Sequence, residues 1–198
     1  NQLISDVLLK DSGNYTKEIV DYVIENQGKQ ARPLLVLLIF KALSVNEKSS
    51  EDAYKSVINA AASIELIHIA SLIHDDILDH ASERRNKPSL NIKWGTESAL
   101  VIGVYFYSTS LKLMAASGML DLVDSLGSSV KAMCEGELDQ LSGRDNFDLD
   151  IEDYISIIKS KTAVLFSTAA LSGALPLGVS KEVKETIIQF GLNLGCLF

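Results

Sequence analysis

Apolar positions along most of the chain recur every three or four residues, the spacing that gathers them on one face of an α-helix. The segment YTKEIVDYVIEN follows this pattern, and Asn14 just before it is expected to cap the helix. A second helix, PLLVLLIFKAL, is expected to begin near Pro33, because proline suits the first helical position. No strand-like alternation persists along the chain. The pattern therefore predicts an all-α fold.

The other predicted helices are separated by short polar loops. They are expected at residues 51–79, 97–116, 119–141, 150–160, 161–176 and 181–198. The loop SGRDNFDLD is rich in acids, but its spacing does not match a calcium-binding EF-hand loop. Asp148 or Asp150 is more simply expected to cap the next helix.

The length of the chain suits one domain, because 198 residues can bury a sizeable core. We expect residues 1–198 to form a single helical domain. The last segment, KETIIQFGLNLGCLF, stays apolar and helical, with no glycine cap, proline or polar tail. We therefore expect that the C-terminal part of this domain is not included in the sequence.

Charge and composition exclude some classes of protein. The formal net charge of −8 argues against a general nucleic-acid surface. Cys134 and Cys196 have no metal-type spacing and are interpreted as reduced core thiols of a cytoplasmic protein. The runs PLLVLLIF and ALVIGVYFY are shorter than the ~20 apolar residues that span a bilayer. No transmembrane segment is expected.

Three aspartates stand at the end of an apolar helix, where local physics disfavours them. Asp75 and Asp79 are one turn apart on one face, and Asp76 flanks them. Like charges at this spacing repel, and carboxylates oppose the dipole at a helix C-terminus. A bound Mg²⁺ ion would relieve both effects, because magnesium takes one or two carboxylates together with water and phosphate oxygens. The simpler alternative is a solvated helix end that carries acids.

His68 favours a buried polar cleft over a solvated helix end. It precedes Asp75 by two helical turns, on nearly the same face. The intervening segment, HIASLIH, is too apolar for an exposed surface, so the polar side chains are expected to face a cleft. Taken alone, His68 is more simply a core or surface histidine.

Two pairs of cations could bind phosphate. Arg84 and Arg85 follow the acidic helix, and guanidinium groups bind phosphate oxygens in bidentate fashion. They could instead neutralise the aspartates in a salt-bridge cluster. Lys29 and Arg32 lie where the helix near Pro33 begins, and backbone N–H groups at a helix start favour anions. Each pair alone is more simply a solvated surface feature.

Taken together, these motifs resemble those of the trans-isoprenyl diphosphate synthase family. GKQARP is similar to the family's G-G-K-x-x-R-P stretch, and IELIHIASLIHDDILDHASERRNKPS is similar to its central aspartate and arginine block. GELDQL and KSKTAVLFSTAALSGAL match later family stretches in the right order. The resemblance covers about residues 15–198 and implies an isoprenoid-synthase-type helical bundle around a central cavity.

The sequence departs from the family pattern at several positions. Gln27 and Gln30 replace a glycine and an arginine, and Val104 stands where the family usually has aspartate. Asn86 replaces the glycine after the arginine pair, a mild change because asparagine tolerates positive φ. The family's second aspartate motif should follow a segment like GLNLGCLF, where the sequence ends.

The resemblance implies a Mg²⁺-dependent prenyltransferase. In this family an allylic diphosphate loses its diphosphate, the resulting cation alkylates isopentenyl diphosphate, and a proton is then lost. By correspondence, Asp75 and Asp79, assisted by Asp76, would hold magnesium, while Arg84 binds the allylic diphosphate. Lys161 and Thr162 would contact the same allylic side. The isopentenyl diphosphate would be held by Lys29, Arg32, His68 and Arg85.

The resemblance also bears on product length. In this family a large aromatic side chain just before the first aspartate motif stops chain growth. Here the corresponding positions are Ala70 and Ser71, both small, with Ile67 one turn deeper as a later stop. Helical spacing alone would select Ser71 and not Ala70, so the choice of Ala70 comes from the resemblance. A long-chain polyprenyl diphosphate, from hexaprenyl to decaprenyl, is expected.

Other readings remain open. One is a non-catalytic or regulatory subunit of a heteromeric prenyl synthase. Another is a class I terpene cyclase, which needs no isopentenyl site, so Lys29, Arg32, His68 and Arg85 count against it. A third is a helical interaction module without chemistry. The segment ALVIGVYFYSTSLKLM is apolar around most of its circumference, which favours a homodimer, as the resemblance also implies.

Overall fold

A computed structural model describes residues 2–10, 12–45, 50–143 and 150–198. Within these residues nearly all regular structure is helical, which confirms the all-α prediction. Contacts divide the chain into two compact units, comprising Asn1–Gln30 with Ala62–Leu113 and Ala31–Ala61 with Met114–Phe198. Each unit is described separately below. That residues 1–198 form one domain stays a prediction.

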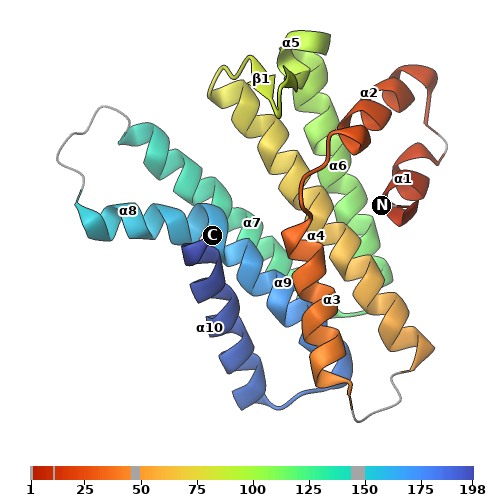
Figure 1. Cartoon of the computed structure of the whole chain (residues 1–198), viewed down its shortest axis with the longest axis vertical. Coiled ribbons are helices and arrows are strands. Elements are labelled where there is room, and N and C mark those ends of the chain that lie inside the picture. The colour runs from red at the N-terminus through yellow and green to blue at the C-terminus, as the bar shows by residue number, and fades with distance from the viewer. Residues whose placement is uncertain (1, 11, 46–49, 144–149) are drawn as a thin grey trace. The chain divides into compact units, whose positions relative to one another are not determined.

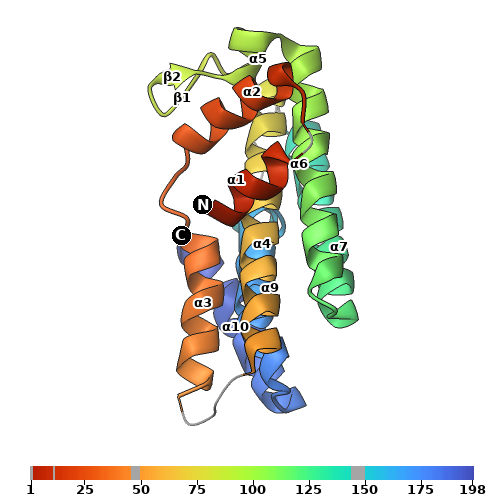
Figure 2. The same ribbon diagram turned by 90° about the vertical axis from the view of Figure 1, so that its right-hand side faces the viewer.

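The first unit is built mainly from two long helices and three shorter ones. It contains α1 (Gln2–Leu9), α2 (Asn14–Glu25), α5 (Leu90–Trp94), and most of α4 (Glu51–Leu78) and α6 (Thr96–Ala116). In this unit α4 and α6 run side by side, with α1 and α2 lying close to them (Figures 1 and 2). The shared apolar cluster includes Val20, Leu66, Ala70, Ile73, Ile102 and Phe106.

The end of α4 is closed by hydrogen bonds of the Schellman type. The N–H of Ala81 donates to the carbonyl of Asp76 at 2.9 Å, and the N–H of His80 donates to the carbonyl of Ile77 at 3.3 Å. His80 has φ of 51°, in the left-handed region where this motif usually places glycine. The chain therefore turns away sharply just after the aspartates.

A short antiparallel hairpin follows α4. Strand β1 (Glu83–Arg84) pairs with β2 (Lys87–Pro88), with Glu83 opposite Pro88. The two loop residues, Arg85 and Asn86, have φ of 54° and 61°, as a type I′ turn requires. The expectation that Asn86 tolerates positive φ is confirmed. The sequence did not predict this hairpin, because two-residue strands carry no detectable alternation.

The second unit surrounds one buried helix. Its elements are α3 (Ala31–Leu43), α7 (Leu120–Ser142), α8 (Ile151–Ile158), the π-helix η1 (Lys159–Ala163), α9 (Val164–Ala174), the 3₁₀-helix η2 (Leu175–Leu177) and α10 (Lys181–Leu197). Every residue of α9 from Leu165 to Ala174 is buried, and α3, α7 and α10 pack against it. Figure 1 shows α9 and α10 side by side.

The helix boundaries agree with most expectations. The long helix predicted at residues 51–79 is found at Glu51–Leu78. Asn14 as an N-cap is wrong, because Gly13 occupies the cap and α2 begins at Asn14. The helix expected near Pro33 begins earlier, at Ala31.

The acid-rich loop and its cap give a mixed outcome. Asp150 caps α8 by accepting a 2.8 Å hydrogen bond from the N–H of Asp153, as expected. Asp148 lies outside the described residues. The predicted boundary between helices at 160 and 161 falls inside η1, which leads from α8 to α9.

The structure bears on two expectations about apolar segments. Cys134 and Cys196 are free thiols, but both are exposed, so their assignment to the core is wrong. In the described part of the chain, α4 and α6 are long and apolar enough to cross a membrane. This evidence is weak, because buried core helices have the same length and composition, and 72% of the apolar window of α4 is buried.

Candidate functional site

A polar-edged pocket lies in the first unit, between the end of α2, one face of α4 and the hairpin. It encloses about 580 Å³, including its open mouth. Much of its wall is apolar, with Ile69, Leu72, Ile73 and Leu90 among the lining residues. Its polar lining includes Gln27, Glu65, His68, Asp76, Arg84 and Arg85. Concave apolar walls with a few convergent polar groups are typical of ligand sites.

One face of α4 supplies three of these polar residues. Glu65, His68 and Asp76 are separated by three and eight positions, which keeps them near one another around the helix. Glu65 is 3% exposed and His68 is partly buried. The prediction that His68 faces a polar cleft agrees with its place in the pocket wall.

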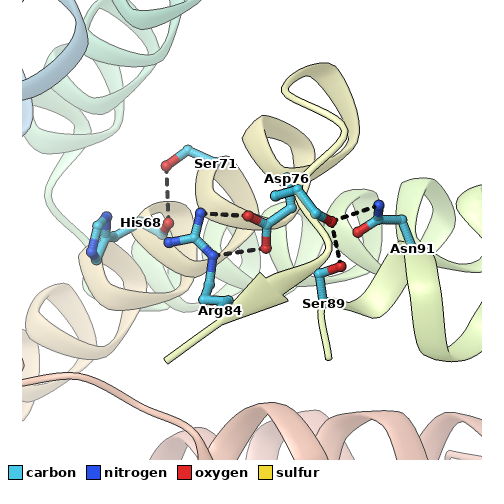
Figure 3. A network of polar contacts seen from close by, with 7 residues as sticks. His68, Ser71, Asp76, Arg84, Ser89 and Asn91 are labelled. Atoms are coloured by element: carbon cyan, nitrogen blue, oxygen red, sulfur yellow. Dashed lines mark hydrogen bonds and ion pairs between the residues drawn. The ribbon is translucent and has the colours of Figure 1, made fainter. Parts of the chain in front are cut away.

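Asp76 and Arg84 form a bidentate ion pair at the edge of the pocket. Nε of Arg84 donates to one carboxylate oxygen of Asp76 at 2.7 Å, and Nη2 donates to the other at 2.6 Å (Figure 3). Asp76 is 5% exposed. The hydrogen bonds that Arg84 donates to Asp76 raise the pKa of Arg84, with further contributions from the charges of Asp76, Asp75 and Asp79. The salt-bridge alternative is therefore realised for this pair.

The chain between α4 and α5 is fixed by its own hydrogen bonds. The hydroxyl of Ser89 donates to the carbonyl of Ala81 at 2.6 Å, and the side-chain amide of Asn91 donates to the same oxygen at 3.2 Å. Figure 3 shows these contacts beside the Asp76–Arg84 pair. These two hydrogen bonds close the base of the loop. The hairpin is therefore held by the ion pair with Asp76 of α4 and by the loop's own hydrogen bonds.

Arg85 reaches across the hairpin to the segment that follows α2. Its Nη1 donates to the carbonyl of Asn26 at 2.6 Å. The guanidinium group lies so close to Gly28 that a Cβ atom there would overlap it. The glycine of the GKQARP stretch thus allows the guanidinium group of Arg85 to come this close. Gly28, the first residue of that stretch, lines the same pocket as Arg85.

Asp75 and Asp79 have the donor chemistry that a divalent cation needs. The N–H of Asp79 donates to the carbonyl of Asp75 at 2.8 Å, so the two residues are one helical turn apart. Asp75 is partly buried and Asp79 is exposed. Among the described residues no group of three histidine, cysteine or acidic side chains is arranged to hold a metal. Two hard carboxylates nevertheless fit Mg²⁺, which keeps several water or phosphate ligands.

In the second unit, Lys161 lies in the π-helix η1 and is held by polar groups of α7. Its Nζ donates to Oε1 of Gln140 at 2.8 Å and forms an ion pair with Glu137. A Cβ atom on Gly136 would overlap Ser160, so glycine allows this close approach. Thr162 follows in the same π-helix and is partly buried. Such π-helical turns occur frequently at functional sites.

The two cations of the GKQARP stretch have different environments. Lys29 is exposed, directly after Gly28. Arg32 belongs to the second unit and is 8% exposed, with its guanidinium carbon 4.5 Å from the centroid of the Phe166 ring. Arg32 therefore lies against an aromatic ring, and the solvated-charge alternative does not describe it.

The positions expected to control product length are not in the pocket wall. Ala70 is 3% exposed and belongs to the apolar cluster of the first unit. Ser71 is partly buried and donates its hydroxyl to the carbonyl of His68 at 2.9 Å (Figure 3). Ile67 is 3% exposed. Their role in chain length stays a prediction.

Several site residues had no assigned role in the sequence reasoning. Tyr22 near the end of α2 and Asn26, the C-cap residue of that helix, line the pocket one turn apart, and Glu65 precedes His68 by one turn on α4. The i, i+4 spacing of Tyr22 and Asn26 was a usable signal. Glu137 was also missed, because only its pairing with Lys161 reveals a role.

A family model described as "Polyprenyl synthetase" matches residues 14–198. The chain belongs to the polyprenyl synthetase family. This polyprenyl synthetase chain is 30% identical over its whole length to octaprenyl diphosphate synthase of Escherichia coli, of which it covers 57%. It is 34% identical over 98% of its length to geranylfarnesyl diphosphate synthase of Methanosarcina mazei, of which it covers 62%.

Solved structures of the family share the fold of this polyprenyl synthetase chain. A polyprenyl synthase of Caulobacter crescentus, complexed with calcium and isoprenyl diphosphate, is similar with a TM-score of 0.89 and 29% identity. The match covers 98% of this chain and 57% of that one. A decaprenyl diphosphate synthase of Rhodobacter capsulatus gives a TM-score of 0.87. The chain thus spans little more than half the length of these relatives.

Proposed function

We propose that the chain belongs to a trans-prenyltransferase that condenses isopentenyl diphosphate with an allylic diphosphate. Family membership supports the reaction class, since the relatives named above are prenyl diphosphate synthases. The observation that carries the proposal is the approach of Arg85 to Gly28, inside the pocket that also contains His68. This contact joins two motifs that the family resemblance assigns to one substrate.

In this proposal the pocket holds isopentenyl diphosphate. Arg85 has further N–H donors beside the one that Asn26 accepts, and guanidinium groups pair well with phosphate oxygens. His68 and Lys29 would contribute further contacts, and Arg32 is included by family correspondence. The apolar wall excludes water, which would otherwise capture the carbocation.

The allylic diphosphate would bind at the acidic end of α4. Asp75 and Asp79 would hold Mg²⁺, which when bound supplies positive charge that stabilises the departing diphosphate. Asp76 orients Arg84, whose remaining nitrogen, Nη1, is not used in the pair and can donate to the same diphosphate. Asp76 is thus better placed to position Arg84 than to bind metal. Lys161 and Thr162 are assigned to the allylic side by correspondence.

Turnover by the full-length protein tests this proposal. With farnesyl and isopentenyl diphosphates and Mg²⁺, Asp75→Asn and Asp79→Asn are each expected to lower kcat by several orders of magnitude, since each removes charge that the leaving group needs. Asp21→Asn, an exposed aspartate on α2, is the matched control and should leave kcat unchanged. Near-normal turnover by either Asp75→Asn or Asp79→Asn would contradict the assignment.

The finer features are also proposals. The product is a long-chain polyprenyl diphosphate, because Ala70 and Ser71 are small and leave room for a growing tail. The protein acts in the cytoplasm, and residues 1–198 belong to a single helical domain. A homodimer would form through α6, where Leu100, Val101 and Val104 are 53%, 66% and 52% exposed.

A heteromeric synthase is the alternative assembly. It is suggested by the name of one relative, heptaprenyl diphosphate synthase component 2 of Geobacillus stearothermophilus, which is 30% identical to this chain over 177 residues. Light scattering of the purified full-length protein distinguishes the two. A dimer with full turnover supports the homodimer, whereas a monomer that needs a second protein for turnover supports the heteromer.

A further inference from the structure

The hairpin that carries Arg84 and Arg85 is attached to α2 through Tyr22. The Tyr22 hydroxyl donates to the carbonyl of Pro88 at 2.7 Å, across 66 positions of sequence. Pro88 ends the hairpin, opposite Glu83. Figure 2 shows α2 passing close to β1, β2 and α5. One tyrosine of α2 therefore holds the returning strand of the arginine hairpin.

The ring of Tyr22 is itself held in place. It packs edge-on against Trp94 of α5, with ring centroids 4.9 Å apart. The ammonium group of Lys93 lies 3.9 Å from the centroid of the Tyr22 ring and 4.2 Å from that of Trp94. A cation placed on two aromatic faces stabilises both rings in one arrangement. The hydroxyl of Tyr22 thus points in a fixed direction.

A second contact joins the same two segments. Arg85 donates to the carbonyl of Asn26, and the side-chain amide of Asn26 donates back to the carbonyl of Tyr22 at 2.6 Å. The acceptor for Arg85 is therefore the C-cap residue of α2, one turn after Tyr22. Arg85 is one of the two loop residues of the hairpin, both of which have positive φ, and Pro88 lies at the end of the second strand. For an arginine this conformation is uncommon and persists only where surrounding contacts impose it.

We propose that Tyr22 is a positioning residue that, together with Lys93 and Trp94, fixes the hairpin so that Arg85 is held ready for a diphosphate group in the pocket. Tyr22 acts through Arg85 and not on the reacting atoms. The inference rests on the proposed function for the nature of the ligand, but the mechanical part concerns the hairpin alone. An arginine already ordered loses less conformational entropy when it binds an anion.

The mechanical part is tested without any ligand. Native trypsin cleavage after Arg84 and Arg85, followed by mass spectrometry, reports how often the hairpin opens. Tyr22→Phe keeps the ring and removes one hydrogen bond, so cleavage there should rise about three- to tenfold. Cleavage after Lys131, whose side chain is exposed on α7, serves as the internal reference for global unfolding and should not change. Unchanged cleavage after Arg84 and Arg85 would overturn the proposal.

The matched control is Tyr15→Phe. Tyr15 lies on the same helix and also makes a tyrosine hydroxyl contact in this unit, at 3.0 Å to the hydroxyl of Ser98. It does not line the pocket. This variant should leave hairpin cleavage at the wild-type rate. An equal rise in both variants would mean that any hydroxyl on α2 has this effect, which would contradict a specific role for Tyr22.

The second arm measures binding of isopentenyl diphosphate by calorimetry. Tyr22→Phe should weaken binding about three- to tenfold, and the same change in an Arg85→Lys background should have no further effect. If Tyr22→Phe weakens binding equally in the wild-type and Arg85→Lys backgrounds, Tyr22 does not act through Arg85, and the proposal is overturned. If the wild-type chain binds no isopentenyl diphosphate, the proposed ligand is wrong, and the trypsin result alone decides whether Tyr22 holds the hairpin.

Discussion

Arg84 binds both carboxylate oxygens of Asp76, the middle member of the three aspartates that end α4. Asp76 is buried, whereas Asp79 is exposed, so the neutralised carboxylate is the one facing the protein interior. The charges of Asp75 and Asp79 also act on Arg84, since both raise the pKa of its guanidinium group. The bidentate pair thus assigns Asp76 to holding Arg84 in place, and metal binding by Asp75 and Asp79 stays a proposal.

Removing the charge of Asp76 should destabilise the fold. Asp76→Asn places an amide N–H₂ group against a guanidinium donor, so we expect a loss of about 1–3 kcal/mol in the free energy of unfolding. Urea denaturation measures it. Asp21→Asn, at an exposed aspartate of α2, is the matched control and should leave the free energy of unfolding nearly unchanged. Equal losses in both variants would show that the pair with Arg84 contributes nothing specific.

Gly28→Ala should weaken substrate binding more than it affects folding. The new Cβ overlaps the guanidinium group of Arg85, which can swing away because it is the end of a flexible side chain. We expect affinity for isopentenyl diphosphate to fall about tenfold, the loss of one charged hydrogen bond. Gly127→Ala, where a Cβ meets nothing within 4 Å, is the control. Wild-type affinity in Gly28→Ala would argue against Arg85 as a ligand group.

Tyr105 should make stability depend on pH in the alkaline range. Burial raises the pKa of the Tyr105 phenol, which donates a 2.6 Å hydrogen bond to the carbonyl of Leu8. Because the folded-state pKa is raised, the stabilisation is fully present below the unfolded pKa, about 10, and is lost as pH rises through the folded value.

The comparison for Tyr105 is with Tyr105→Phe. The difference in free energy of unfolding between wild type and this variant should stay constant from pH 7 to about 9 and shrink above about 10, near the unfolded tyrosine pKa. Guanidinium denaturation at each pH gives the values. A difference that grows with alkaline pH would reverse the sign of the linkage and contradict the buried, neutral phenol.

Ala70→Tyr should shorten the products of the full-length enzyme. The introduced ring fills space that a growing tail would need, and it overpacks the apolar cluster at a cost of about 1–3 kcal/mol. Product length is measured by mass spectrometry. Ala99→Tyr, at another buried alanine of the same cluster, should cost similar stability without changing the product. If the unmodified enzyme releases mainly farnesyl diphosphate with isopentenyl diphosphate in excess, the long-chain proposal fails.

The helical fold could be predicted because burial of one helix face produces a local, periodic pattern of apolar residues in the sequence. The long helix was expected at residues 51–79 and is found at Glu51–Leu78. The cap at Asp150 was predictable for the same reason, since it depends on residues three positions apart. The cysteines mark the limit: their residue type favours the interior, but Cys134 and Cys196 lie on exposed helix faces.

The motifs located the candidate site in the sequence, but they could not assign partners within it. In the sequence alone, Asp75, Asp76 and Asp79 are the same type of residue. Arg84 could therefore have paired with any of them. The Schellman turn at His80 redirects the chain after α4 so that Arg84 meets Asp76. The positive φ angles of Arg85 and Asn86 then reverse the chain into β2. In the sequence, only Asn86 indicated such positive φ angles, because asparagine tolerates them.

The contacts that shape the pocket join segments far apart in sequence. Arg85 binds the carbonyl of Asn26, and Tyr22 binds that of Pro88, across 59 and 66 positions. Sequence periodicity reports which face of a helix is buried, because that depends on neighbouring residues. It carries no information about which distant backbone carbonyl a side chain will reach. That depends on the direction in which the chain leaves each helix, which only the tertiary structure decided.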